Sequence, residues 1–126
     1  MNKLSRLTFQ RKVVHEEVMS RCDHPTADQI YESIQINFPN LTKSNVYRNL
    51  DILSKEGKIH LISIPGCNRY DLNISKHYNV VCKKCGKVED ADISYMEEFD
   101  KKVSQKTGFL KHSVIFETLC LKCQKN

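Results

Sequence analysis

The chain lacks any long run of apolar residues, which excludes a membrane-spanning helix. Its first residues, Met1-Asn2-Lys3-Leu4, contain no apolar stretch of signal-peptide length. No internal repeat or low-complexity segment interrupts the 126 residues, so we expect one domain or two very small ones. These absences together predict a cytoplasmic protein with no membrane partner.

The chain also lacks a strong charge of one sign in either half. The formal net charge is +5, with nine basic and seven acidic side chains in residues 1–65 and eleven and eight in residues 66–126. Such an even and modest positive charge is compatible with nucleic-acid binding, but it does not identify that function.

Cysteine, by contrast, is abundant, with six residues. Four of them form two C-x-x-C pairs separated by 34 residues: Cys82 with Cys85, and Cys120 with Cys123. Two such pairs supply the four thiolates that structural zinc prefers, and we predict a closed zinc site that ties the end of the chain to a distant segment. Redox or disulfide pairs are the alternative, which a reducing cytosol disfavours. Cys22 and Cys67 remain as plain thiols.

Hydrophobic spacing predicts three helices in the first half of the chain, over residues 8–22, 26–38 and 43–56. Thr26 and Gln29 form a capping box at the start of the second helix, and Thr42 caps the third. Gly57 is the residue type expected just after a helix. The side chains expected to face the core are Val14, Val18, Cys22, Ile30, Ile34, Phe38, Val46, Leu50 and Leu53.

Short strands are predicted next, at residues 58–64 and 69–73, and helix-turn-helix followed by a hairpin is the winged form of that motif. The second half reads as strands at 77–82, 87–91 and 109–119, with a helix at 94–107 whose inward residues would be Met96, Phe99 and Val103. We therefore expect an α+β protein. Residues 1–73 would form a winged-helix DNA-binding domain, and residues 74–126 a small α/β dimerisation domain that the zinc site staples.

The polar face of the third predicted helix suits the major groove of DNA. Arg48 can pair with guanine, the ring of Tyr47 can pack on a thymine methyl group, and Lys43 and Ser44 suit phosphates. A solvated helix face is the alternative, because mixed polar residues are common on any surface helix. The capped helix before it and the hairpin after it favour DNA reading.

A second candidate metal site consists of scattered imidazole and oxygen donors, which suit iron(II), manganese(II) or zinc. Its residues are His24, Asp71, His77, Asn79 and Asp90. From the residues alone, loop, turn and solvated side chains are the more common interpretation of such a scattered set.

Several segments resemble the ferric uptake regulator family: H-P-T-A-D-Q-I-Y (24–31), N-V-Y-R-N-L (45–50), N-R-Y-D (68–71), H-Y-N-V-V-C-K-K-C-G-K-V-E-D (77–90) and C-L-K-C (120–123). The resemblance covers residues 8–123 in the same order. It implies a homodimeric, metal-dependent repressor that binds double-stranded DNA at a near-palindromic operator and is not an enzyme. By resemblance, the four paired cysteines hold structural zinc, Tyr47 and Arg48 contact bases, and Arg6 is the basic residue that precedes the first long helix and enters the minor groove.

The resemblance also implies a regulatory metal site at His24, Asp71, His77, Asn79 and Asp90. Aspartate at positions 71 and 90, where iron sensors usually have glutamate, is similar to the peroxide-sensing (PerR-like) branch. In that branch bound iron(II) reacts with peroxide and a ligand histidine is oxidised, here His24 or His77. The alternative is an iron- or zinc-uptake regulator of the same family without peroxide chemistry.

The chain departs from the family pattern in three places. Asn79 replaces the second histidine of an H-x-H motif, and the helix that normally precedes residue 6 is almost missing. A further metal site of some members has lost two ligands to Lys76 and Tyr78, so we interpret the remaining His112 as structural or solvated.

In the expected mechanism one ion takes ligands from both domains and stabilises one domain angle. Two rival interpretations remain open. A non-haem iron enzyme would use the same two histidines and carboxylates, but no substrate pocket or catalytic base is evident. A zinc-ribbon interaction module would hold one zinc per chain and bind DNA independently of iron or manganese.

Overall fold

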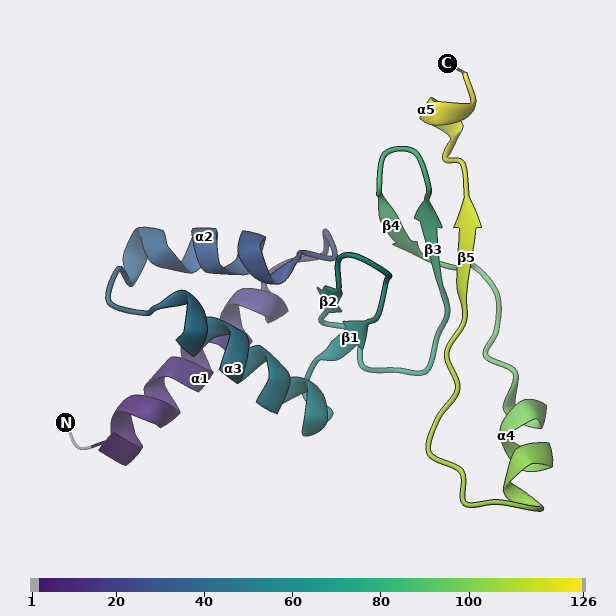
Figure 1. The fold of residues 1–126 in the computed structure, drawn as a ribbon, viewed down its shortest axis with the longest axis horizontal. Helices are drawn as coiled ribbons and strands as arrows, with labels where there is room; N and C mark the ends of the chain where they lie inside the picture. Colours follow the sequence, from purple (N-terminus) through teal and green to yellow (C-terminus); the bar gives the residue numbers. More distant parts are fainter. Residues whose placement is uncertain (1–2, 126) are drawn as a thin grey trace. The chain divides into compact units, whose positions relative to one another are not determined.

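The computed structural model describes residues 3–125, and the chain divides into two compact units between Ile74 and Ser75. We call them the N-terminal unit and the C-terminal unit and describe each by itself. Figure 1 shows three helices and a hairpin in the first unit, and a small sheet with two short helices in the second.

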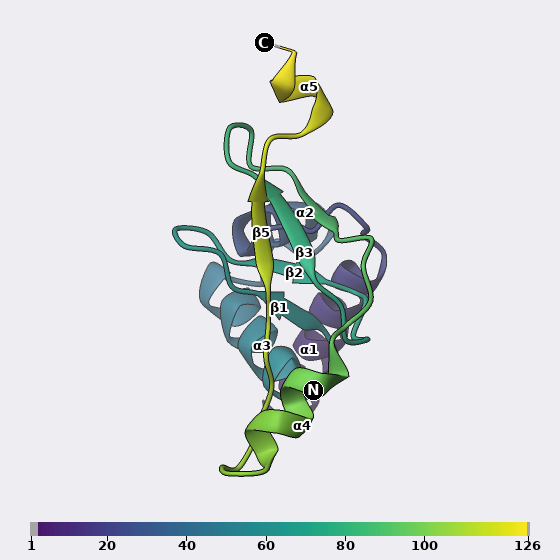
Figure 2. The same cartoon turned by 90° about the vertical axis from the view of Figure 1, so that its right-hand side faces the viewer.

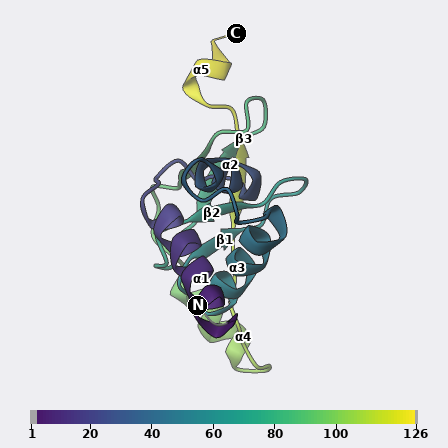
Figure 3. The same cartoon turned by 90° about the vertical axis from the view of Figure 1, so that its left-hand side faces the viewer.

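The N-terminal unit is a winged helix-turn-helix. Its elements are α1 (Lys3–Met19), α2 (Ala27–Asn37), α3 (Lys43–Lys55), β1 (His60–Ile62) and β2 (Arg69–Asp71). The strands β1 and β2 pair antiparallel, with His60 opposite Asp71. Figure 3 shows the three helices packed around one another, as expected for a shared core.

The predicted caps at the start of α2 and of α3, and the glycine after α3, are confirmed. The side chain of Thr26 accepts the N–H of Gln29, whose side chain reaches back to the Thr26 N–H at 2.9 Å. Thr42 and Asn45 form the same reciprocal arrangement at the start of α3. Gly57 has φ +74°, and the N–H groups of Gly57 and Lys58 donate to carbonyls of the last turn of α3. This pair of hydrogen bonds requires a left-handed backbone conformation after the helix, which glycine adopts without strain.

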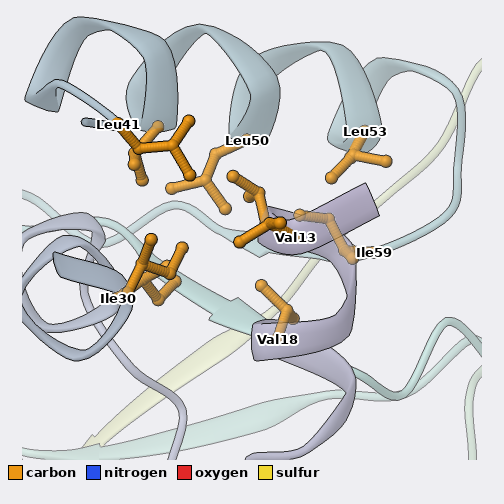
Figure 4. Close-up of a cluster of buried hydrophobic side chains, with 10 residues drawn as sticks. Val13, Val18, Ile30, Leu41, Leu50, Leu53 and Ile59 are labelled. Carbon is orange, nitrogen blue, oxygen red and sulfur yellow. The ribbon is translucent and has the colours of Figure 1, made fainter. Parts of the chain in front are cut away.

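The core of the N-terminal unit lies between the three helices, as Figure 4 shows. Its buried members are Val13, Val14, Val18, Ile30, Ile34, Leu41, Val46, Leu50, Leu53 and Ile59. Seven of the nine residues predicted to face inward belong to this cluster. Cys22 and Phe38 do not: both are exposed, because α1 ends at Met19 and α2 at Asn37, so each lies beyond its helix.

The C-terminal unit contains β3 (Asn79–Cys82), β4 (Val88–Asp90), α4 (Glu97–Ser104), β5 (Ile115–Thr118) and α5 (Leu121–Gln124). The strand order is β4-β3-β5, with β3 antiparallel to β4 and parallel to β5. Figure 2 shows α4 and α5 at opposite ends of this sheet. The first two strands were predicted to within two residues at each end, whereas helix 94–107 and strand 109–119 are shorter than predicted.

The C-terminal unit buries little apolar surface. Among its described residues, the buried apolar or aromatic side chains are Tyr78, Cys82 and Val88. The predicted inward stripe of α4 is instead exposed: Met96 by 40%, Phe99 by 49% and Val103 by 50%. The prediction that this stripe faces inward is therefore wrong for a single chain, since 40–50% of each side chain stays accessible to solvent.

Two further differences concern the ends of the chain. Helix α1 begins at Lys3, five residues earlier than predicted, so Arg6 lies inside the helix and not before it. The short helix α5 was not predicted. Within residues 3–125, no helix is both long and apolar enough to cross a membrane.

Candidate metal centres and nucleic-acid interface

The four paired cysteines converge within the C-terminal unit. One sulfur from each of Cys82, Cys85, Cys120 and Cys123 lies within 4.8 Å of all the others. Cys82 ends β3 and Cys85 lies in the turn that leads to β4. The second pair brackets the start of α5, which the parallel pairing of β5 with β3 brings alongside. The Cys85 and Cys120 sulfurs are 3.8 Å apart. Tetrahedral zinc with Zn–S bonds of about 2.3 Å places its sulfurs about 3.8 Å apart, so the cluster fits zinc.

The thiols of this cluster have very different acidities. Backbone N–H groups of Cys120 and Cys85 point at the Cys82 sulfur and lower its pKa to about 5. A hydrogen bond to Cys120, with burial, raises the pKa of Cys123 to about 12. The backbone thus stabilises a first thiolate, and crowding opposes the last. A divalent cation that binds all four sulfurs replaces those protons, which makes metal binding here proton-linked.

The N-terminal unit brings together two of the five predicted regulatory ligands. The His24 Nε2 atom lies 3.5 Å from Asp71 Oδ2, and both side chains are about nine-tenths buried. His24 has φ +51°, a conformation that non-glycine residues adopt at some cost in energy. Strand β2 of the same unit holds His24 there. The His24 carbonyl accepts a hydrogen bond from Arg69 at 3.1 Å, and the Pro25 carbonyl accepts one from the Tyr70 N–H at 2.9 Å. The Asn73 N–H donates to the other Asp71 oxygen at 3.1 Å.

The C-terminal unit brings together the other three. His77 Nε2 lies 3.3 Å from Asp90 Oδ1, and the side-chain amide of Asn79 donates to that same oxygen at 3.2 Å. Asn79 and Asp90 are opposite each other in the β3–β4 register. His77 Nδ1 donates to the Ser75 carbonyl at 2.7 Å, which leaves the lone pair on Nε2. Asn79 thus supports Asp90 through its amide nitrogen, a role that sequence reasoning, which considered only its oxygen, did not foresee.

Each imidazole–carboxylate pair has the spacing of two donors to one ion. Bonds of about 2.1 Å to a shared cation separate two donor atoms by about 3 to 4 Å. Nitrogen and oxygen donors of this kind suit iron(II), manganese(II) or zinc. The hydrogen bond from His77 to Ser75 is also the outer-shell contact that typically orients a metal-binding histidine.

His112, by contrast, is committed to the protein at both ring nitrogens. The Tyr78 hydroxyl donates to Nε2 at 2.7 Å, and Nδ1 donates to the Asp100 carboxylate. The Tyr95 ring stacks on the imidazole, with centroids 4.3 Å apart, and its hydroxyl donates to Asp100 at 2.5 Å. No lone pair remains for a cation, which agrees with the structural interpretation of His112. Nothing in the sequence pattern singled out Asp100 or Tyr95.

The side chains predicted to contact DNA are all exposed on helices of the N-terminal unit. Arg6 is on α1, and Lys43, Ser44, Tyr47 and Arg48 occupy the first two turns of α3. Behind this face, Asn49 of α3 is buried and accepts from Arg11 of α1 at 3.4 Å. The opposite stripe of α3 packs in the core, so its outer face is held on a rigid element.

Known proteins match this chain over almost its whole length. Residues 2–118 match the ferric uptake regulator family. The peroxide-responsive repressor PerR of Staphylococcus aureus is 30% identical over 122 residues, which cover 94% of this chain and 82% of that protein.

Solved structures agree. The ferric uptake regulator of Helicobacter pylori, a structure with three functional metal-binding sites, superposes with a TM-score of 0.76 and 25% identity, over 93% of this chain and 81% of that one. The Campylobacter jejuni peroxide stress regulator gives a TM-score of 0.71 and 29% identity, over 98% and 100%. These likenesses place the chain among metal-responsive transcriptional repressors and not among enzymes. The chain belongs to the ferric uptake regulator family.

Proposed function

We propose that this regulator senses peroxide through an iron(II) or manganese(II) ion held by His24, Asp71, His77 and Asp90. The observation that carries the proposal is the pair of pre-assembled imidazole–carboxylate contacts, at 3.5 Å and 3.3 Å, in which both carboxylates are aspartates. The likeness to a peroxide-responsive repressor and to a peroxide stress regulator supports it.

The chain's own residues prepare these donors. Arg69 and Tyr70 hold the backbone around His24, and Asn73 positions Asp71. Ser75 sets the tautomer of His77, and Asn79 orients Asp90 from the neighbouring strand, as an outer-shell residue and not as a fifth ligand. An ion that draws ligands from both pairs binds the liganded arrangement of the two units better than any other, so it shifts the population toward that arrangement.

The proposed output is DNA binding through α3. Tyr47 and Arg48 would contact bases, and Lys43, Ser44 and Arg6 would contact backbone phosphates or the minor groove. The apolar stripe of α4 supports a homodimer, since Met96, Phe99 and Val103 remain 40–50% exposed to solvent within the described chain. A second copy that covers the stripe would present two α3 helices to a near-palindromic operator.

Iron(II), when bound, would activate peroxide as a two-electron oxidant. One peroxide oxygen would be inserted into a C–H bond of a ligand imidazole, and the other would leave as water. His24 and His77 are the two candidates. An oxidised ring carries a carbonyl group and N–H nitrogens, so the nitrogen that faces its aspartate no longer offers a lone pair to a metal. Metal affinity therefore falls, and the DNA-binding arrangement is no longer favoured. The four cysteines would keep their zinc, since their role is structural.

The test combines operator binding with mass spectrometry. The iron-loaded protein is treated with peroxide, and peptides that contain His24 or His77 are examined for one extra oxygen atom. We expect oxidation at one of them together with loss of the gel shift. His24→Ala and His77→Ala should abolish metal-stimulated binding, while His15→Ala, a histidine of α1 outside both pairs, should not.

The outcomes separate the candidate functions. Metal-stimulated binding without histidine oxidation would favour an iron- or zinc-uptake regulator. Metal-stimulated binding that survives in both His24→Ala and His77→Ala would overturn the proposed regulatory site. Binding that ignores every added metal would leave only the structural zinc.

A further inference from the structure

One carboxylate engages two of the side chains that we assign to DNA contact. Asp28, in the first turn of α2, lies 3.1 Å from the Lys43 ammonium of α3 and accepts a hydrogen bond from the Tyr47 hydroxyl. Lys43 also lies 5.7 Å from the centre of the Tyr47 ring. The three side chains therefore form a closed set on the surface of the N-terminal unit, joining the two helices of the helix-turn-helix.

The set is exposed, so DNA can reach it. The Asp28 and Lys43 side chains are 58% and 57% accessible to solvent. An exposed pair of this kind adds little to folding stability, so stability alone does not account for it. The charge is nevertheless well placed, because an acidic residue in the first turn of a helix interacts favourably with the helix dipole. The hydrogen bond from Tyr47, followed by that from Lys43, lowers the pKa of Asp28, which keeps it ionised at neutral pH.

We propose that Asp28 sets the DNA affinity of this regulator by competing with a backbone phosphate for Lys43 and by holding Tyr47 in the free protein. This inference rests on the proposed function of α3. A phosphate that binds Lys43 must break the contact to Asp28 and leave that carboxylate unpaired beside the DNA, where two anions repel within a Debye length. The penalty applies to DNA of any sequence. Asp28 therefore weakens operator and non-operator binding alike, which restrains occupation of DNA by the regulator.

The competition has a measurable signature in the salt dependence. A lysine that neutralises a phosphate releases a cation from the DNA, and the slope of log K against log salt steepens by about 0.9 per contact. In the wild type this release is offset, because the freed Asp28 carboxylate adds a negative charge beside the DNA, and the combined field retains cations there. When the carboxylate charge is removed, the cation release from the DNA should appear in full in the salt dependence.

The deciding experiment uses Asp28→Asn, which keeps the size of the side chain and an acceptor for Tyr47. Its affinity for an operator duplex and for an unrelated duplex should both rise, by roughly 5- to 10-fold at 0.1 M salt, with a salt slope steeper by about 0.9. The gain should vanish in the double variant Asp28→Asn/Lys43→Gln. The matched control is Glu117→Gln in the C-terminal unit. It also removes one carboxylate charge and one exposed contact to a lysine, because the Glu117 carboxylate lies 3.0 Å from the Lys83 ammonium. It should leave the slope unchanged.

The results separate the role of Asp28 from the proposed role of α3 in DNA binding. An unchanged slope in Asp28→Asn, or an equal gain in the Lys43→Gln background, overturns the role of Asp28. If Lys43→Gln and Arg48→Ala in the otherwise wild-type protein both leave DNA binding intact, then α3 is not the reading helix, and the proposed function fails first. All these substitutions are on the exposed surface, so every variant should stay folded at the assay temperature. Asp28→Asn should lower the melting temperature only slightly, through the lost interaction with the helix dipole, and thermal unfolding serves as the folding control.

Discussion

The Tyr78 hydroxyl lies 2.7 Å from His112 Nε2 and also accepts the N–H of Met96 at 3.0 Å. It thereby joins the residue before β3, the segment before β5 and the N-terminus of α4. Tyr78→Phe keeps the ring but leaves two polar partners unbonded, and Tyr78 is only 2% exposed. We expect a loss of about 1–3 kcal/mol in the free energy of unfolding, measured by urea unfolding at a fixed protein concentration.

The matched control for this variant is Tyr31→Phe. Its hydroxyl also accepts a hydrogen bond, from Gln35 at 2.8 Å, but in an exposed position where water can replace the lost partner. Tyr31→Phe should change stability by less than about 0.5 kcal/mol. Equal effects of the two substitutions would contradict a supporting role for the buried cluster around His112.

The Asp100 carboxylate should make the stability of the buried cluster around His112 depend on pH. Burial opposes its ionisation, but hydrogen bonds from Tyr95 and then His112 outweigh burial and hold the pKa of Asp100 below its usual value. A lowered pKa in the folded state means that the stabilising contribution is complete above the unfolded-state pKa and is lost as the pH falls through the folded-state pKa. Asp100→Asn should therefore destabilise the protein at neutral pH, and its deficit relative to wild type should shrink on acidification. The check is a pair of melting curves across that range; a deficit that is independent of pH would contradict the assignment.

Loss of one zinc ligand should unfold the C-terminal unit. Structural zinc contributes about 10–16 kcal/mol in small domains, whereas this unit buries few apolar side chains of its own. Cys123→Ser should reduce bound zinc well below one per chain and abolish cooperative unfolding of the unit, as read by metal analysis and circular dichroism. Cys22→Ser and Cys67→Ser, at exposed cysteines outside the cluster, are the controls and should retain zinc.

The apolar stripe of α4 should govern self-association. Phe99→Glu places a charge in the middle of Met96, Phe99 and Val103. If each copy loses about 2 kcal/mol, as at a typical interface hot spot, the dimer weakens by about a thousandfold. Sedimentation or size-exclusion chromatography should show monomers, and Lys102→Glu, on the same helix outside the stripe, should remain dimeric. A Phe99→Glu protein that stays dimeric would exclude α4 from the interface.

Features that depend on residues close in sequence could be predicted well. The capping boxes at Thr26 and Thr42, the helix end at Gly57 and the buried stripe of α3 each arise within a segment of at most eight residues, so local chemistry is enough. The two C-x-x-C pairs also predicted that the four cysteines gather, because four soft ligands at that spacing are typical of a structural zinc site.

Other features arise between distant residues and were missed or misplaced. No local signal connects Asp100 with His112, or Asp28 with Lys43 and Tyr47, since each contact depends on how helices and strands pack. The role of Asn79 as a donor to Asp90 follows from the β3–β4 register, which places the two residues opposite each other.

By itself, the sequence determined the order of elements in the N-terminal unit and the cysteines that gather, because capping, periodicity and thiolate chemistry are local properties of side chains. The candidate regulatory ligands came from the resemblance to a known family. Only the tertiary structure decided where α1 begins and how His112 is bonded. It also decided that the α4 stripe stays half-exposed in one chain and that a carboxylate lies beside the side chains proposed to contact DNA. Those outcomes depend on which side chains remain exposed after the core of each unit has formed. That division between buried and exposed side chains is a property of the whole fold.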